Sequence, residues 1–102
     1  MKATTGNDTL LSKHDKKIVQ KYVRLLDAVP GPISVWATTD EGLLHFYTLI
    51  SPDREIETKL YEVERQLILA IDPELVDFDV HTRPEIIHEY LFKNTPPLYK
   101  RP

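Results

Sequence analysis

The stretch ISVWATTDEGLLHFYTLI, residues 33–50, decides the fold. On both sides of a central Thr-Asp-Glu-Gly turn the residue character alternates at every second position, which is the period of a β-strand rather than of a helix. Gly42 in this turn can adopt the positive φ that tight hairpins require. The second arm is apolar on both of its faces, which is typical of a central strand. The stretch therefore predicts a β-hairpin with strands at 33–39 and 43–50.

Helices are expected on both sides of this hairpin. Ser12 can cap a first helix, which Pro30-Gly31-Pro32 must end because proline fixes φ and lacks an N–H. Ser51-Pro52 has the cap-then-proline order of a second helix start, and Asp72-Pro73 marks its end near residue 71. The apolar residues at helical spacing are Ile18, Val19, Tyr22, Val23, Leu25, Leu26 and Val29 in the first helix, and Ile56, Leu60, Val63, Leu67, Ala70 and Ile71 in the second.

The C-terminal third completes the fold. Residues 75–81 alternate again, with Val76, Phe78 and Val80 expected inward, and Pro84 opens a short last helix. A strand–helix–strand crossover is right-handed, which makes the third strand parallel to the second. We therefore predict an α+β fold of order α-β-β-α-β-α with a mixed three-stranded sheet. It forms one domain at 11–95, between a flexible arm at 1–10 and a C-terminal tail at 96–102.

Composition narrows the function classes. The 102 residues include 13 Lys and Arg against 16 Asp and Glu, a net charge of −3, whereas nucleic-acid binders need a cationic surplus. There is no cysteine, so thiolate metal sites and thiol nucleophiles are excluded. No secretory signal pattern and no apolar run of membrane-spanning length occurs. We expect a cytoplasmic protein that binds neither nucleic acid nor membranes.

Three strings point to a known family. They are WATTDEG at 36–42, VDFDV at 76–80 and LYKR at 98–101. Together with the element order, they resemble the minimal nucleotidyltransferases of the polymerase-β-like superfamily over residues 16–101. In that family the first strand ends in a Phe-Gly-Ser-Arg turn, the second carries Asp-x-Asp, and the third is of the Val-Asp-Leu-Val type. The resemblance implies a nucleotidyltransferase-like fold.

The departures from that family bear on activity. Ala37-Thr38 stands where the Gly-Ser pair would let the backbone approach a triphosphate, and Asp40 and Glu41 would repel it. The second strand has no Asp-x-Asp, although two-metal phosphoryl transfer needs carboxylates to hold its ions. Only Asp77 remains as a candidate remnant. We therefore expect a non-catalytic domain that acts by protein–protein interaction, with no cofactor. The other interpretation is an unrelated α+β fold whose element order coincides with that of the family by chance.

An alternative chemical function remains open. Asp77, Asp79 and His81 alternate on one face of the third strand, and His45 is expected on the neighbouring strand. Carboxylates and imidazoles suit many divalent metal ions, so the four residues are a candidate metal or remnant site for a nucleotide-binding or nucleotidyl-transfer enzyme. Half-buried strands also place polar residues on their wet face without any function. Alternation alone favours that second interpretation.

The hairpin itself is the candidate interface. The second strand carries Leu43, Tyr47 and Leu49 on the face opposite Leu44, Phe46 and Ile50, and Trp36 is expected beside Tyr47. Both faces favour burial, and a small domain has few helices with which to cover them. An uncovered apolar patch of this kind usually marks an interface. We expect the protein to bind a protein partner or a second copy of itself through Trp36, Leu43, Tyr47 and Leu49, although packing in the core would also explain Trp36 and Tyr47.

Overall fold

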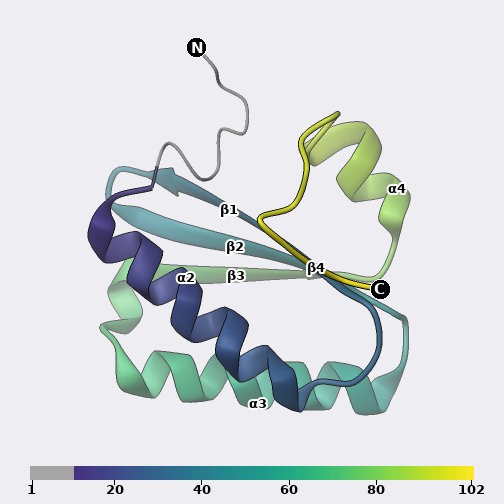
Figure 1. Cartoon of the computed structure of the whole chain (residues 1–102), viewed down its shortest axis with the longest axis horizontal. Coiled ribbons are helices and arrows are strands. Elements are labelled where there is room, and N and C mark those ends of the chain that lie inside the picture. The colour runs from purple at the N-terminus through teal and green to yellow at the C-terminus, as the bar shows by residue number, and fades with distance from the viewer. Residues whose placement is uncertain (1–10) are drawn as a thin grey trace.

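The structure is a computed structural model, and it describes residues 11–102. It is an α+β fold in which two helices cover one face of a mixed four-stranded sheet (Figure 1). The expected arm at 1–10 lies outside the described residues. Within residues 11–102, no helix combines the length and the apolar character needed to cross a membrane.

The hairpin forms as predicted. Strands β1 (Ile33–Asp40) and β2 (Leu43–Ile50) pair antiparallel, with Ile33 opposite Ile50 and Asp40 opposite Leu43. Only Glu41 and Gly42 lie between the strands, and both have positive φ, at 53° and 85°. Two consecutive left-handed residues are the turn geometry that matches the right-handed twist of the flanking strands. Glu41 therefore adopts a conformation that residues other than glycine rarely use.

Helix α2 (Lys13–Leu25) continues as the 3₁₀ turn η1 (Leu26–Ala28). The expected cap at its start is confirmed, because the Asp15 N–H donates to the Ser12 hydroxyl at 3.0 Å. Helix α3 (Arg54–Ala70) starts two residues later than the Ser-Pro pattern suggested. Its cap is Asp53, whose carboxylate accepts from the N–H groups of Glu55 and Ile56. A carboxylate also interacts favourably with the positive end of the helix dipole, which explains why Asp53 rather than Ser51 is the cap.

The third strand, β3 (Val76–His81), follows the short 3₁₀ turn η2 (Pro73–Leu75) and runs parallel to β2, as the crossover rule predicted. Beyond it, α4 (Pro84–Ile86) continues into the wider turn η3 (Ile87–Leu91), which has π-helical hydrogen bonding. Both the parallel pairing and the short helix that opens at Pro84 are confirmed.

The strand count is corrected from three to four. Residues 99–101, expected in a C-terminal tail, form β4 (Tyr99–Arg101), which pairs antiparallel with β1 and gives the sheet order β3-β2-β1-β4. Two prolines precede this strand, and three residues are too few to display an alternation. Tertiary contacts identify it instead, because the Leu98 N–H donates to the Val35 carbonyl at 2.9 Å.

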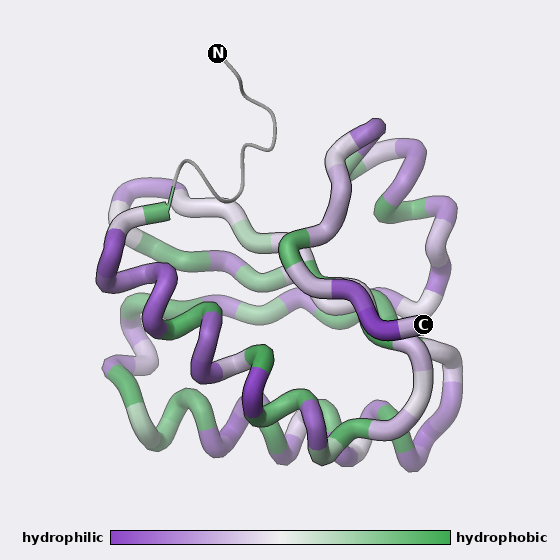
Figure 2. The backbone as a smooth tube through the Cα atoms, in the orientation of Figure 1, coloured by the Kyte–Doolittle hydropathy of each residue, from purple (hydrophilic) through white to green (hydrophobic). Residues whose placement is uncertain are grey.

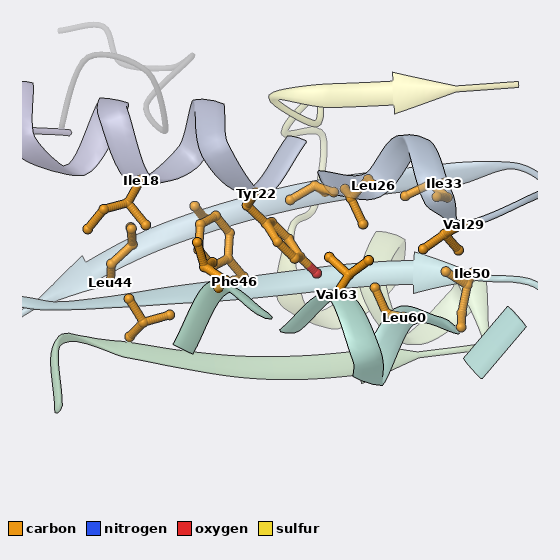
Figure 3. Packing of buried hydrophobic residues seen from close by; sticks show 14 of the residues in the cluster. Ile18, Tyr22, Leu26, Val29, Ile33, Leu44, Phe46, Ile50, Leu60 and Val63 are labelled. Atoms are coloured by element: carbon orange, nitrogen blue, oxygen red, sulfur yellow. The ribbon is translucent and has the colours of Figure 1, made fainter. Parts of the chain in front are cut away.

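The main core lies between the sheet and helices α2 and α3. Figure 3 shows Ile18 and Tyr22 of α2 and Leu26 of η1 pointing towards the sheet, where Leu44 and Phe46 lie. Apolar residues are accordingly interleaved with polar ones along both helices (Figure 2). Most of the predicted stripe is buried or half-buried, and Ala70 is the exception because it lies exposed at the end of α3. This layer leaves the opposite face of the sheet for other residues to cover.

A second, smaller cluster covers part of that opposite face. It consists of the buried residues Trp36, Ile87 and Phe92, against which Tyr47 and Leu49 pack. The Phe92 ring stacks on Trp36 with a centroid distance of 5.5 Å, and the Trp36 indole N–H donates to the Thr95 carbonyl at 2.9 Å. The segment from α4 to Thr95 thus forms a partial lid over one end of the hairpin. We refer below to the sheet surface opposite α2 and α3 as the second face.

Candidate functional site

Strand pairing brings the four polar candidates together on the second face. In the parallel register, His45 lies opposite Asp77, Tyr47 opposite Asp79, and Leu49 opposite His81. Because successive side chains point to opposite faces, all of these residues project from the same side. The structure therefore brings together the four residues that the sequence analysis grouped, with Asp77, Asp79 and His81 on β3 and His45 on the adjacent strand β2.

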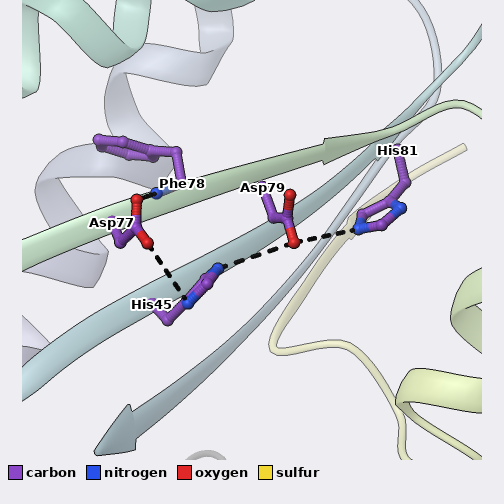
Figure 4. Close-up of polar contacts among 5 residues, drawn as sticks. All are labelled: His45, Asp77, Phe78, Asp79 and His81. Carbon is purple, nitrogen blue, oxygen red and sulfur yellow. Dashed lines mark hydrogen bonds and ion pairs between the residues drawn. The ribbon is translucent and has the colours of Figure 1, made fainter.

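The four side chains form a row in the order Asp77, His45, Asp79, His81 (Figure 4). His45 Nδ1 lies 3.8 Å from Asp77 Oδ2, and His45 Nε2 lies 3.9 Å from Asp79 Oδ2. At the other end, His81 Nε2 lies 3.6 Å from the same Asp79 oxygen. These distances are within the reach of ion pairing but too long for direct hydrogen bonds. We call this set the His–Asp row.

The two histidines of the row differ from the two aspartates in exposure. The Asp77 and Asp79 side chains are 57% and 52% exposed, whereas those of His45 and His81 are only 25% and 19% exposed. The Nε2 atoms of both histidines are fully buried and have no hydrogen-bond partner. His45 also stacks on Tyr47 with a centroid distance of 4.3 Å. The imidazoles are therefore packed into the surface, while the carboxylates face the solvent.

The arrangement of the row bears on metal binding. A divalent ion needs several donors around one point at about 2.0–2.2 Å. In Figure 4 the carboxylate oxygens and imidazole nitrogens lie in a line along the face, with Asp79 between the two imidazoles, and do not surround a common centre. Within residues 11–102, no group of three or more His, Asp or Glu side chains is arranged to hold a metal ion. Ion binding at the His–Asp row would therefore require the strands or side chains to rearrange.

The expected interface residues differ in their exposure. Trp36 is only 1% exposed because Phe92 and Ile87 cover it, so the structure corrects its assignment to an uncovered patch. Leu43, Tyr47 and Leu49 are half-buried. Tyr47 and Leu49 pack against the edge of the Trp36 cluster, whereas Leu43 lies at the far end of β2, next to the hairpin turn. The lid therefore covers one end of the hairpin's second face and leaves the other end partly open.

The sequence pattern did not predict a polar group in the main core. Glu64 on α3 is only 8% exposed, and its Oε2 atom has no hydrogen-bond partner. Burial raises the pKa of the Glu64 carboxyl to about 7. Nearby, the Tyr22 hydroxyl shares a 2.7 Å hydrogen bond with the Thr48 hydroxyl, and burial, reinforced by Glu64, raises the pKa of Tyr22. Glu64 follows Leu60 by four residues and precedes Leu67 by three, so its helical spacing was the available signal.

A second residue that the sequence did not reveal is Arg101. Its guanidinium donates to the backbone carbonyls of Leu26, Val29 and Gly31. These carbonyls lie at and just after η1, where a helix end leaves acceptors without intrahelical partners. Arg101 thereby joins the C-terminal strand to the turn that precedes β1. No local pattern marks such a contact between residues that are 70 or more positions apart.

Comparisons of the chain with protein-family models, with curated proteins and with solved structures find no match.

Proposed function

We propose that this chain is a non-catalytic, nucleotidyltransferase-like domain that acts by binding another protein through the open end of its second face. The observation that carries the proposal is the partial cover of the hairpin. The lid buries Trp36, while Leu43 and Tyr47 remain half-buried beside the exposed carboxylates of Asp77 and Asp79. Apolar and aromatic side chains next to charged ones are typical of an interface with a polar rim.

The charges of this surface favour a partner with basic side chains. Asp77 and Asp79 are more than half exposed, and no Lys or Arg within residues 11–102 forms an ion pair with either carboxylate. A partner that places an apolar side chain near Leu43 and Lys or Arg side chains near the two carboxylates would complement it. Complementary potentials contribute chiefly to the association rate and to specificity.

The interaction can be tested by site-specific photo-crosslinking in the native host. A photoreactive phenylalanine analogue replaces Leu43 on the proposed surface or, as a control, Lys59 on the exposed side of α3. We expect a discrete protein adduct from position 43 and none from position 59, and we expect Tyr47→Glu to abolish the adduct. Equal labelling from both positions, or no adduct from either, would reject the proposal.

The expectation that the domain is non-catalytic is tested separately by calorimetry, which measures whether the chain binds ATP in the presence of magnesium. The turn at 36–42 lacks the Gly-Ser pair, and β2 lacks Asp-x-Asp, so we expect no saturable heat at micromolar nucleotide. The His–Asp row favours one competing function, a metal-dependent nucleotide binder. Saturable binding that is lost in Asp77→Asn but retained in Asp72→Asn, a control outside the row, would establish that function instead.

A further inference from the structure

The strand β4 lies at an edge of the sheet. In the order β3-β2-β1-β4 it is a terminal strand, and within residues 11–102 it pairs only with β1 (Figure 1). The backbone groups on its other side have no strand partner in this part of the chain. Such an edge is a template for the addition of a further strand. This edge is separate from the second face and from the His–Asp row.

A groove runs beside this edge, between β4 and helix α2. Its larger part, about 450 Å³, is lined by Val19 and Val23 from α2 and by Leu98 and Tyr99 from the β4 segment, together with polar residues at its rim. A smaller cavity of about 140 Å³ adjoins it near Leu11 and shares Val19, Gln20 and Leu98 with the larger one. The groove is therefore elongated. All four of its principal apolar residues are half-buried.

The charge of the groove is opposite to that of the whole protein. Lys16 and Arg24 line it from α2, and Asp27 is its only acidic lining residue within the described part of the chain. The ion pairs found within residues 11–102 use neither of these two cations. The chain as a whole carries a net charge of −3. A locally cationic groove on an anionic protein selects an acidic ligand.

We infer that the groove between α2 and β4 binds an extended, acidic segment of a partner protein, which adds to the sheet next to β4. In this mode of recognition, backbone hydrogen bonds to the strand edge supply affinity, and alternate side chains enter pockets that supply specificity. Apolar side chains of the segment lie against Val19, Val23 and Leu98. Its carboxylates lie near Lys16 and Arg24.

The inference is tested with a capped peptide in which valine alternates with glutamate, titrated into the isotopically labelled full chain. We expect saturable amide shifts in residues 98–101 and in α2, with a dissociation constant of about 1 mM or tighter. The matched peptide with lysine in place of glutamate should bind at least about tenfold more weakly. Equal binding of the two peptides, or no shift with either of them, would overturn the inference.

Two variants separate groove binding from non-specific attraction. Val23→Glu puts a charge into the groove and should abolish the shifts, whereas Leu69→Glu, on the exposed side of α3, should leave them unchanged. The double variant Lys16→Glu with Arg24→Glu changes only exposed positions and should reverse the preference towards the lysine peptide. Unchanged preference in the double variant would reject the role of these cations. None of these readouts depends on the second face, so the outcome is independent of the function proposed above.

Discussion

At the scale of single residues, Glu64 makes the stability of the protein depend on pH. Its carboxyl has a pKa of about 7 in the folded chain against an ordinary value of 4.5, because burial disfavours the charged form. The protonated carboxyl is therefore compatible with the core below about pH 4.5, and this contribution is lost as the pH rises through 7. We expect Glu64→Gln to raise the free energy of unfolding by about 1–3 kcal/mol at pH 8 and to have little effect at pH 4.5.

Urea denaturation at the two pH values measures this difference. Glu62→Gln is the matched control, because Glu62 lies on the same helix but is exposed. It should change the free energy of unfolding by less than about 0.5 kcal/mol at either pH. An equal effect of Glu64→Gln at both pH values would show that packing of the side chain, rather than its ionisation, determines the outcome.

Arg101 is the other residue whose contribution can be isolated. Its planar guanidinium reaches three backbone carbonyls at once, which a lysine ammonium on a flexible chain cannot reproduce. We expect Arg101→Lys to lower the free energy of unfolding by about 1.5–3 kcal/mol, the range for hydrogen bonds to charged groups. Chemical denaturation provides the measurement, and Lys100→Ala on the same strand should be nearly neutral. A neutral Arg101→Lys would mean that β4 is held by its pairing with β1 alone.

At the scale of elements, the lid, which is the segment from α4 to Thr95, depends on a few aromatic contacts. Phe92 is buried and contacts both Trp36, at 5.5 Å, and Tyr47, at 4.9 Å between centroids. Phe92→Ala should lower the free energy of unfolding by about 3 kcal/mol or more and loosen the lid. Trp36 is the only tryptophan of the chain, so its fluorescence emission should shift to longer wavelength as water reaches the indole.

A nearby residue provides the control for this prediction. Tyr90 lies in the same segment but is 75% exposed, and Tyr90→Ala should leave the emission of Trp36 unchanged. The far-ultraviolet circular dichroism of the Phe92→Ala protein should stay close to that of the wild type, because the main core lies on the other face of the sheet. An unshifted emission in Phe92→Ala would show that the lid stays closed without this ring.

At the scale of the whole molecule, the question is whether the partner of the second face is another copy of the same chain. The protein has a mass of 11.9 kDa and one sheet face that is only partly covered, so association would add buried apolar area to a small core. We expect light scattering at micromolar concentration to show a mass that rises with concentration. Tyr47→Glu should restore the monomer mass without unfolding it, since Tyr47 is only half-buried.

A mass near 11.9 kDa at every concentration would exclude self-association and leave a different protein as the partner. Loss of folding in Tyr47→Glu would instead identify Tyr47 as part of the core. The half-buried position of Tyr47, between the lid and the His–Asp row, makes the folded outcome the expected one.

The sequence by itself determined the hairpin, the two long helices and the parallel third strand. Alternation at residues 33–50 and 75–81 and the Ser12 cap are local features, and the handedness of the crossover is set by backbone sterics. Local alternation also placed Asp77, Asp79 and His81 on one face. What these side chains share is a period of two, which is visible within a few residues of sequence.

The tertiary structure alone decided β4, the cover over Trp36 and the distances within the His–Asp row. Tyr99–Arg101 is a strand only because β1 offers a free edge, and Trp36 is buried only because Phe92, far along the chain, folds back onto it. Glu64 lies beside the apolar stripe of α3, and its raised pKa depends on which neighbouring residues exclude water from its carboxyl group. Each of these features rests on contacts between residues distant in sequence, and no local period records such contacts.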